Sequence, residues 1–328
     1  MFAVYAKGPN FDDPLAGLAT GDRPETPVPE GWVTVSVRAA SLNMHDVSTL
    51  RGLRMGREQF PMILGCDGAG VLQDGTEVVI HSSINDPAWV GEETLDPDRT
   101  VLSERYQGSF ADIVAVPARN VLPKPASLSF EEAACTGTAW LTAYRMLFVN
   151  SGLRPGETML VQGRRRLGSI ATALVQLGVA GGMRVWVAGR EDERTAHRLG
   201  AVGTFDLDAG PPDLADAVFD AGVDEASWSH SLRWLRPGGV VVCSGYRSGE
   251  TQAGYALTAL YRLIFSELRL VGSAMGTRGD LAGLLSFLDR CAVRPEIAME
   301  LPLERAEQGF RALTEGGVAG KIVFTRHP

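Results

Sequence analysis

The chain has 328 residues, of which 45% are hydrophobic and 21% charged, a composition typical of folded globular proteins and too apolar for a disordered chain. At roughly 150 residues per domain, this length predicts about two domains. The balance of 31 Lys and Arg against 39 Asp and Glu leaves a net charge of -8, which argues against a general nucleic-acid binder or an anionic-membrane binder.

No apolar run reaches the roughly 18 residues that a membrane span needs. Together with the net negative charge, this predicts neither a membrane nor a nucleic-acid partner. The four cysteines are far apart in the sequence and form no CxxC pair: Cys66, Cys135, Cys243 and Cys291. This spacing favours reduced thiols and a cytoplasmic protein.

The first part of the chain predicts a compact β-rich domain. Period-two alternation and short apolar runs indicate strands at residues 32–37, 77–81 and 111–116. Turns marked by glycine and proline separate these runs, as at Gly8-Pro9 and Asp74-Gly75.

From about residue 123 the pattern changes to alternating helices and apolar strands. Ser129 followed by Glu131 and Glu132 predicts the start of a helix that runs toward Phe148. Beyond it we expect strands at 158–162, 184–188, 217–220, 240–244 and 268–271, with helices at 171–177, 191–199, 226–235 and 280–290. Short apolar strands that alternate with amphipathic helices predict a doubly wound parallel sheet, and 320–324 returns to strand.

Several short motifs in this order resemble the medium-chain dehydrogenase/reductase superfamily over nearly the whole chain. They are Ala40–Asp46 (ASLNMHD), Pro61–Gly70 (PMILGCDGAG), Gly108–Asp112 (GSFAD), Leu153–Glu157 (LRPGE), Leu235–Gly239 (LRPGG) and Gly320–Val323 (GKIV). The chain is most similar to the zinc-independent, quinone-oxidoreductase-like branch. The resemblance implies an α/β protein with a GroES-like catalytic domain at 1–122, completed by 292–328, and a Rossmann-type dinucleotide-binding domain at 123–291. It also implies a homodimer, with Leu268–Gly272 as the candidate pairing strand.

A glycine-containing loop after the first strand of the alternating region is the expected cofactor-binding element. It reads Gly163-Arg164-Arg165-Arg166-Leu167-Gly168-Ser169-Ile170-Ala171. Such loops let the backbone approach a pyrophosphate at a helix N-terminus. One register takes Gly163-x-Arg165-x-x-Gly168 as the fingerprint, and the other takes Gly168-x-x-Ala171 as its last two positions. The length of the following helix favours the second register, which makes the loop about two residues longer than the family pattern.

The three arginines in this loop leave alternatives open. Guanidinium groups beside a helix N-terminus make a strong anion site that could clamp the cofactor phosphates. Their bulk could instead fill the groove and exclude the dinucleotide, or they could be solvated surface side chains. We favour the phosphate clamp because the fold binds anions at this loop.

Other residues point to NADP(H) as the cofactor. The second strand ends at Gly189-Arg190, where NAD-selective enzymes usually place a carboxylate for the ribose hydroxyls, so a cation there favours the 2′-phosphate. Glu191 and Asp192 are expected to serve as first-turn charges of the next helix. By resemblance, further cofactor contacts are expected from Thr142, Ser244, Gly245, Arg247 and Lys321.

The resemblance also predicts that no zinc is bound. The positions that correspond to zinc ligands in zinc-dependent relatives look like Asn43, Cys66 with Asp67, and Thr138. One amide, one thiol and one hydroxyl are poor zinc ligands compared with thiolates and imidazole. The four closely spaced cysteines of a structural zinc lobe are missing as well.

Without zinc, hydrogen bonds must polarise the substrate carbonyl. The resemblance implies NADP(H)-dependent reduction of an enone, a quinone or a related small carbonyl compound. By resemblance Asn43 is the expected donor, His45 is a candidate proton source because histidine titrates near neutral pH, and Asp46 supports the local backbone. A structural hydrogen bond is an equally good interpretation of His45. The alternative function is a non-redox cyclase, isomerase or lyase whose dinucleotide site is blocked by Arg164–Arg166.

Overall fold

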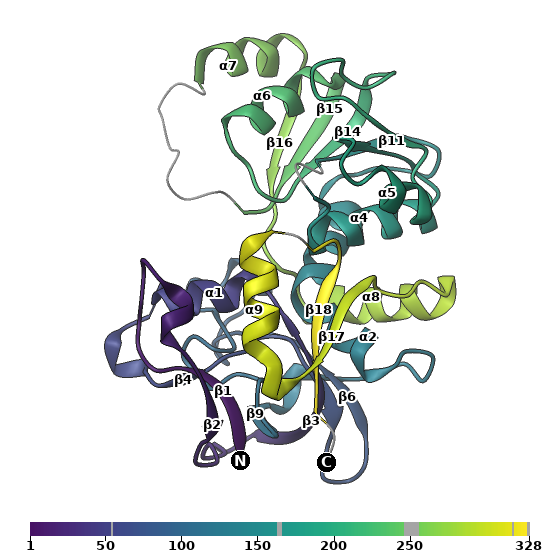
Figure 1. The fold of residues 1–328 in the computed structure, drawn as a ribbon. Helices are drawn as coiled ribbons and strands as arrows, with labels where there is room; N and C mark the ends of the chain where they lie inside the picture. Colours follow the sequence, from purple (N-terminus) through teal and green to yellow (C-terminus); the bar gives the residue numbers. More distant parts are fainter. Residues whose placement is uncertain (54, 163–165, 246–255, 317, 327–328) are drawn as a thin grey trace. The chain divides into compact units, whose positions relative to one another are not determined.

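The computed structural model describes residues 1–53, 55–162, 166–245, 256–316 and 318–326 (Figure 1). The chain divides into two compact units. Unit 1 comprises Met1–Leu141 and Gly276–Pro328, and unit 2 comprises Thr142–Met275. Among the described residues, none of the helices combines the length and the apolarity that crossing a membrane requires.

Unit 1 is built from sheets whose strands are antiparallel, except for the parallel pair β17 and β18. Its largest sheet has the order β10-β6-β5-β3-β18-β17, with β9 also paired to β3. These strands span Val121–Pro123, Glu77–Ile80, Ala69–Val71, Trp32–Leu42, Lys321–Thr325, Ile297–Pro302 and Ile113–Pro117. The smaller sheets are β2-β1-β4 (Leu18–Asp22, Phe2–Ala6, Met62–Ile63) and β7-β8 (Ser83–Ile84, Thr100–Val101). Ile322 in β18 pairs with Leu42 in β3, so the C-terminal strand completes a sheet begun nearly 300 residues earlier.

Helices cover the sheets of unit 1. They are α1 (Met44–Arg51), α2 (Phe130–Ala134), α8 (Arg278–Cys291) and α9 (Ala306–Glu315), with short 3₁₀ turns at Pro14–Gly17, Arg57–Gln59, Glu93–Leu95, Ala118–Asn120 and Leu303–Arg305. At the core, the ring of Phe110 meets those of Phe310 and Phe324 edge-on, with centroids 6.3 and 5.0 Å apart. Apolar side chains of β3, together with the consecutive buried residues Ile322, Val323 and Phe324 of β18, supply much of this buried surface.

Unit 2 is a parallel six-stranded sheet with the order β13-β12-β11-β14-β15-β16. The strands span Gly203–Phe205, Arg184–Ala188, Thr158–Gln162, Ala215–Asp220, Leu235–Cys243 and Arg269–Gly272. Helices α4 (Ser169–Ala180) and α5 (Glu193–Arg198) cover one face, and α6 (Glu225–Arg233) and α7 (Ala256–Phe265) cover the other (Figure 1). The strand order reverses between β11 and β14, which is the point where doubly wound sheets bind ligands.

The unit boundaries differ from the expected divisions at 122/123 and 291/292. Unit 1 includes residues 123–141 and 276–291. Hydrogen bonds hold the start of α8 to the rest of this unit. At the start of α8, the backbone N–H of Arg278 donates to Glu93 and its guanidinium donates to the carbonyl of Arg119. Near the end of α8, Asp289 accepts a hydrogen bond from Ser127.

The predicted helix from Ser129 toward Phe148 is interrupted. Ser129 does cap its start, since its hydroxyl accepts from the N–H of Glu132 at 3.2 Å. After α2, however, the backbone forms a π-helical segment at Thr136–Trp140, a short α3 (Leu141–Tyr144) and a second π-helical segment at Arg145–Asn150. Such wide turns shift the side chains that follow and are frequent at functional sites.

Candidate functional site

A buried polar cluster in unit 1 is organised around the carboxylate of Asp67, which has no exposed surface. Its Oδ2 accepts hydrogen bonds from Ser41 Oγ at 2.7 Å and from Asn43 Nδ2 at 2.8 Å. Its Oδ1 accepts from Thr138 Oγ1 at 2.5 Å and from Ser82 Oγ at 3.1 Å. Several hydrogen-bond donors are needed here because moving a charged carboxylate from water into the protein interior costs free energy that these bonds must offset.

Lys321 supplies the positive charge of this cluster. Its Nζ lies 3.4 Å from Asp67 Oδ2, and both side chains are fully buried. The same ammonium donates to Asn43 Oδ1 at 2.7 Å and to the carbonyl of Leu42 at 2.9 Å. These three acceptors use the three protons of the ammonium. Lys321, the first residue of β18, is therefore placed within unit 1 and not at an exposed position suited to cofactor phosphates.

Asn43 stands between the strand β3 and the helix α1, and its side chain turns into the cluster. Besides Asp67, its Nδ2 lies 3.1 Å from the carbonyl of Ser41 and 3.6 Å from Cys66 Sγ. The amide of Asn43, which we predicted to donate to a substrate carbonyl, thus donates its hydrogens to acceptors within unit 1.

Asp46 fixes the backbone that carries Asn43. Its two carboxyl oxygens accept from the N–H of Asn43 at 2.8 Å and from the N–H of Gly65 at 2.9 Å. Burial raises the pKa of Asp46 to about 7, although both backbone N–H groups oppose this shift. The expected supporting role of Asp46 agrees with this geometry, which ties the start of α1 to the loop between β4 and β5.

The π-helical segment brings Thr138 to Asp67. A Cβ atom at Gly137 would lie 2.7 Å from both Asp67 Oδ1 and Ser82 Oγ, so only glycine allows this approach. Thr138 Oγ1 is also 3.4 Å from Cys66 Sγ. Thr138 is half-buried, whereas the side chains of Asp67 and Cys66 are fully buried.

His45 is directed away from these contacts and toward Glu104. Its Nδ1 lies 4.0 Å from Glu104 Oε1, and 21% of its side chain is exposed. The structure therefore brings Asn43, Asp46 and Lys321 together around Asp67. The neighbour of His45 is Glu104 instead. The proton-donor role of His45 stays a prediction.

In unit 2, the expected cofactor loop joins β11 to α4. Gly163, Arg164 and Arg165 lie outside the described residues. Gly168 caps α4 without any side-chain bond, and a Cβ there would meet nothing within 4 Å. Arg166 is exposed. The position of Gly168 directly before the helix agrees with the second register.

Asp192, which we expected to place negative charge in the first turn of α5, instead anchors the loop between β11 and α4. Asp192 is the residue before α5, but it makes no side-chain capping bond. Its Oδ2 accepts a hydrogen bond from the N–H of Leu167, and both residues are buried. Arg190, two residues earlier, is exposed. After β12, the guanidinium of Arg190 is therefore exposed to solvent, whereas the buried carboxylate of Asp192 is hydrogen-bonded to the N–H of Leu167.

The end of β15 carries two further predicted residues. Gly245 has φ of +83°, a conformation that favours glycine, and the N–H of Ser244 donates to the carbonyl of Asp220 at 2.9 Å. Arg247 lies outside the described residues. Thr142, at the start of unit 2, is buried in α3 with 3% of its surface exposed.

Sequence reasoning missed the roles of Asp67 and Asp220. Asp220 ends β14 at the carboxyl edge of the parallel sheet and is 1% exposed. Its Oδ1 accepts from the N–H of Gly222 at 3.0 Å, and its buried Oδ2 has no hydrogen-bond partner among the described residues. The available signal for Asp220 was an acidic residue directly after the apolar run 217–219, at the edge where such sheets bind ligands.

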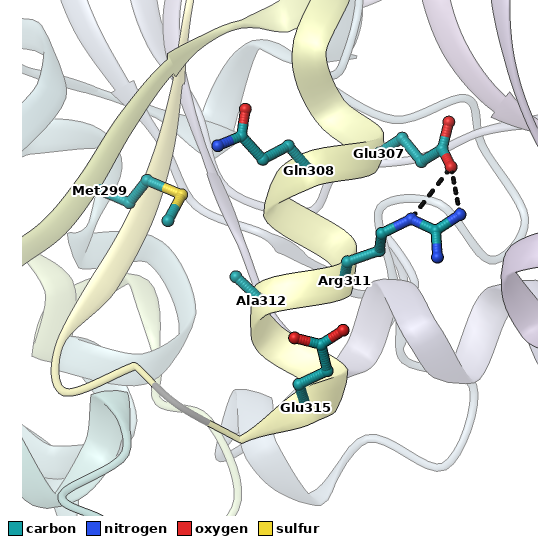
Figure 2. Close-up of a pocket in the computed structure, with 6 residues that line it drawn as sticks. All are labelled: Met299, Glu307, Gln308, Arg311, Ala312 and Glu315. Carbon is teal, nitrogen blue, oxygen red and sulfur yellow. Dashed lines mark hydrogen bonds and ion pairs between the residues drawn. The ribbon is translucent and has the colours of Figure 1, made fainter.

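A separate, open groove of about 470 Å³ lies on unit 1 beside α9 (Figure 2). It is lined by Met299, Glu307, Gln308, Arg311, Ala312 and Glu315. Glu307 and Arg311 pair with each other at 2.6 Å and are both about 60% exposed. Two of its charged side chains thus pair with each other in solvent, and none of the predicted site residues lines this groove.

Two family models match the chain. Residues 29–126 match the alcohol dehydrogenase GroES-like domain, and residues 169–290 match the zinc-binding dehydrogenase domain. An alcohol dehydrogenase of Geobacillus stearothermophilus is 27% identical over 90% of this chain and 92% of its own length. An acryloyl-coenzyme A reductase of Metallosphaera sedula is also 27% identical, with coverage of 90% and 92%.

Solved structures agree with these matches. The crystal structure of an NAD-dependent alcohol dehydrogenase superposes with a TM-score of 0.86 at 29% identity and covers the whole of both chains. The chain belongs to the medium-chain dehydrogenase/reductase superfamily, which confirms the predicted combination of a GroES-like domain and a Rossmann-type sheet. It is accordingly an oxidoreductase.

The zinc that one matching family model carries in its description does not fit the residues at the corresponding positions. An amide, a thiol and a hydroxyl stand at Asn43, Cys66 and Thr138, and burial raises the pKa of the Cys66 thiol well above its usual range. Zinc binds thiolate, not thiol. Among the described residues, no group of three or more His, Cys, Asp or Glu side chains could hold a metal ion.

A nicotinamide dinucleotide fits the described part of unit 2 better. Open space at Gly168 leaves the N-terminus of α4 accessible to a phosphate. Asp220, whose buried Oδ2 accepts no hydrogen bond from the described residues, lies at the same carboxyl edge of the sheet. Both features favour a bound ligand at the carboxyl ends of the strands.

Proposed function

We propose that this oxidoreductase is NADP(H)-dependent and zinc-independent, and that it reduces an enone, a quinone or a related small carbonyl compound. The observation that carries the cofactor assignment is the end of β12. There Arg190 is exposed, while Asp192, the buried carboxylate two residues later, is hydrogen-bonded to the N–H of Leu167. A carboxylate that already accepts this bond is poorly placed to select the free ribose hydroxyls of NAD(H).

Charge complementarity explains the preference. A guanidinium at the end of the second strand attracts the 2′-phosphate of NADP(H) and binds it through charge-assisted hydrogen bonds. Arg166 adds a second exposed cation near the N-terminus of α4. Arg164 and Arg165, adjacent in the sequence, strengthen the expected positive charge of this loop.

When bound, the cofactor supplies a hydride to the substrate. The protein must orient the substrate and donate a proton to the oxygen or carbon atom that becomes negatively charged. Both amide hydrogens of Asn43 face acceptors within unit 1, so His45, which is 21% exposed, is the better candidate for the proton. The relative that reduces acryloyl-coenzyme A supports a conjugated carbonyl compound as the substrate class.

A cofactor titration tests the proposal directly. Purified protein is titrated with NADPH and, in parallel, with NADH up to millimolar concentration, and nicotinamide fluorescence and the melting temperature are followed. We expect a tighter response to NADPH. No response to either cofactor would overturn the NADP(H) assignment, and a tighter response to NADH would overturn the role of Arg190.

The arginine-rich loop has its own test. Replacing Arg164, Arg165 and Arg166 together by Gly-Ser-Gly removes three cations and their bulk. If the arginines clamp phosphate, affinity for NADPH falls in this variant. If the wild-type protein binds no dinucleotide and this variant does, the arginines block the groove, as the non-redox alternative requires.

We also propose a homodimer that forms through the edge strand β16. This strand ends the parallel sheet, and its Leu270 is 49% exposed. An exposed apolar face on α7 belongs to the same unit and contains Leu260, Tyr261, Ile264 and Phe265, which are 46–72% exposed. Sedimentation velocity at micromolar concentration should give a dimer for the wild type and a shift toward monomer for Leu270→Lys. A monomeric wild type would contradict this proposal.

A further inference from the structure

Thr138 is the most exposed member of the polar cluster around Asp67. Asn43 is 7% exposed, and the side chains of Cys66, Asp67 and Ser82 have no exposed surface, whereas Thr138 is half-buried. A ligand that approaches this cluster therefore meets Thr138. Its hydroxyl carries one proton and two lone pairs, so what it offers a ligand depends on where the proton points.

The proton of the Thr138 hydroxyl points inward, toward Asp67. Oγ1 lies 2.5 Å from Asp67 Oδ1, and a carboxylate can only accept. The hydroxyl of Ser82 is 3.4 Å from Thr138 Oγ1, and it lies 3.1 Å from the same oxygen of Asp67. A short hydrogen bond to a carboxylate is stronger than a long one between two hydroxyls. Thr138 thus keeps lone pairs and no proton for a ligand.

The neighbouring donors are directed to acceptors in the same way. The amide hydrogens of Asn43 face Asp67 Oδ2 at 2.8 Å and the carbonyl of Ser41 at 3.1 Å. Burial raises the pKa of the Cys66 thiol, so this group keeps its proton. Its Sγ lies 3.4 Å from Thr138 Oγ1 and is the donor of that contact, because the proton of Thr138 is directed to Asp67. At Thr138 the cluster therefore presents an acceptor to a ligand.

We propose that Thr138 is a specificity-determining residue that accepts a hydrogen bond from a hydroxyl group of the ligand. A carbonyl oxygen can only accept, so it forms no hydrogen bond with an oxygen whose proton is directed elsewhere. Reduction of a C=O bond adds a hydride to carbon and a proton to oxygen, and the product carries a hydroxyl group. Reduction of the C=C bond of an enone leaves the carbonyl in place. The inference rests on the proposed function and narrows its substrate class to quinone/hydroquinone and carbonyl/alcohol pairs.

A binding comparison without cofactor tests the role of Thr138. Cyclohexanol and cyclohexanone are similar in size and differ at one oxygen. Each is titrated into the full-length wild-type protein and followed by ligand-observed NMR, which gives both dissociation constants. We expect cyclohexanol to bind about three- to tenfold more tightly, the factor that one neutral hydrogen bond supplies.

Variants separate ligand binding from the support of Asp67. Thr138→Val removes the hydroxyl and keeps the shape of the side chain, so the preference for cyclohexanol should disappear. Thr138→Ser keeps the hydroxyl and should retain the preference. Ser82→Ala is the matched control, because it also removes one donor from Asp67 Oδ1 but at a fully buried position. It should lower stability and leave the preference unchanged.

Two results of the binding comparison would overturn the role of Thr138. One is the same preference for cyclohexanol in Thr138→Val as in the wild type. The other is a wild-type protein that binds cyclohexanone as tightly as cyclohexanol, or that binds neither. A cooperative melting transition establishes that each variant is folded, and Thr138→Ala replaces the valine variant if that one does not fold.

The product formed from one enone tests the substrate class. With NADPH, 2-cyclohexen-1-one yields 2-cyclohexen-1-ol if the C=O bond is reduced and cyclohexanone if the C=C bond is reduced, and gas chromatography separates the two. We expect the alcohol, and cyclohexanone as the main product would overturn the narrower substrate class. Absence of turnover would count against the proposed function itself, whereas the binding comparison, which uses no cofactor, would still decide the role of Thr138.

Discussion

The Asp67 cluster of unit 1 and the carboxyl edge of the sheet in unit 2 use polar residues in opposite ways. In the cluster, a buried carboxylate accepts from Ser41, Ser82 and Thr138 and is neutralised by Lys321. At the sheet edge, Asp220 keeps a buried oxygen that accepts no hydrogen bond from the described residues. Polar groups that satisfy one another stabilise a fold, whereas a buried polar atom without a partner calls for a water, an ion or a functional role.

The two regions also differ in their cations. The ammonium of Lys321 has no exposed surface and its three protons are used, whereas Arg190 and Arg166 are open to solvent. We therefore expect changes in the cluster to act on stability, and changes at the sheet edge to act on cofactor affinity.

The largest expected effect is that of Lys321→Met on stability. The change leaves the carboxylate of Asp67 buried without its counter-charge, which costs about 3–5 kcal/mol of unfolding free energy. Urea denaturation measures it. Arg311→Met, which breaks the exposed pair with Glu307, is the matched control and should cost about 1 kcal/mol or less.

A charge-balanced variant separates the ion pair from packing. Asp67→Asn combined with Lys321→Met removes both charges and should be more stable than Lys321→Met alone. If the combination is less stable than the single variant, the cost arises from lost packing and hydrogen bonds and not from an uncompensated charge.

Asp46 should make stability depend on pH. Burial raises the folded-state pKa from 3.8 to about 7, so the folded protein holds this proton more tightly than the unfolded chain does. The resulting contribution is fully present below about pH 4 and is lost as the pH rises through about 7, with a total on the order of a few kcal/mol.

The comparison with Asp46→Asn isolates this contribution. The amide does not titrate, so the unfolding free energy of the variant relative to the wild type should rise between pH 4 and 7.5. A constant offset from the lost second acceptor is expected, because Asp46 accepts two backbone N–H bonds. Parallel stability curves for the two proteins would show that Asp46 does not titrate in this range.

Much of the fold could be predicted because the decisive signals are local. The strands β11 and β12 were placed at 158–162 and 184–188, where the structure has them, because buried parallel strands are short continuous apolar runs. In contrast, β3 extends to Leu42, beyond the expected 32–37, since its last residues pair with β18 from the other end of the chain. Local periodicity contains no information about that partner.

The candidate site was predicted less completely for the same reason. Asn43 and Asp46 were recognised from a contiguous motif, and Asp46 does bond to the backbone of Asn43. Lys321 was expected at the cofactor phosphates, but its ion-pair partner Asp67 lies 254 residues earlier in the sequence. No spacing rule connects two such residues, and the pairing of β18 with β3 and of β3 with β5 brings them together.

At the sheet edge, Arg190→Ser tests the cofactor assignment. Loss of a charge-assisted contact with the 2′-phosphate should raise the Kd for NADPH about tenfold and leave that for NADH nearly unchanged. Fluorescence titration at low and moderate salt measures both constants. Arg194→Ser, on the exposed surface of α5, is the control and should change neither. Equal weakening of the two cofactors in Arg190→Ser would mean that Arg190 does not contact the 2′-phosphate.

The smallest expected effect is that of Asp192→Ala, because it removes a single hydrogen bond to the N–H of Leu167. A loop anchor affects every ligand that uses the loop, so we expect the Kd values for NADPH and NADH to rise by the same factor, about fivefold. Without cofactor, amide exchange at Leu167 should become faster, which hydrogen-exchange mass spectrometry of that peptide measures. Glu191→Ala, at an exposed neighbouring position, should leave both readouts unchanged. A selective loss of NADH affinity in Asp192→Ala would instead identify Asp192 as a ribose ligand, because only a direct contact can distinguish two cofactors that share the same loop.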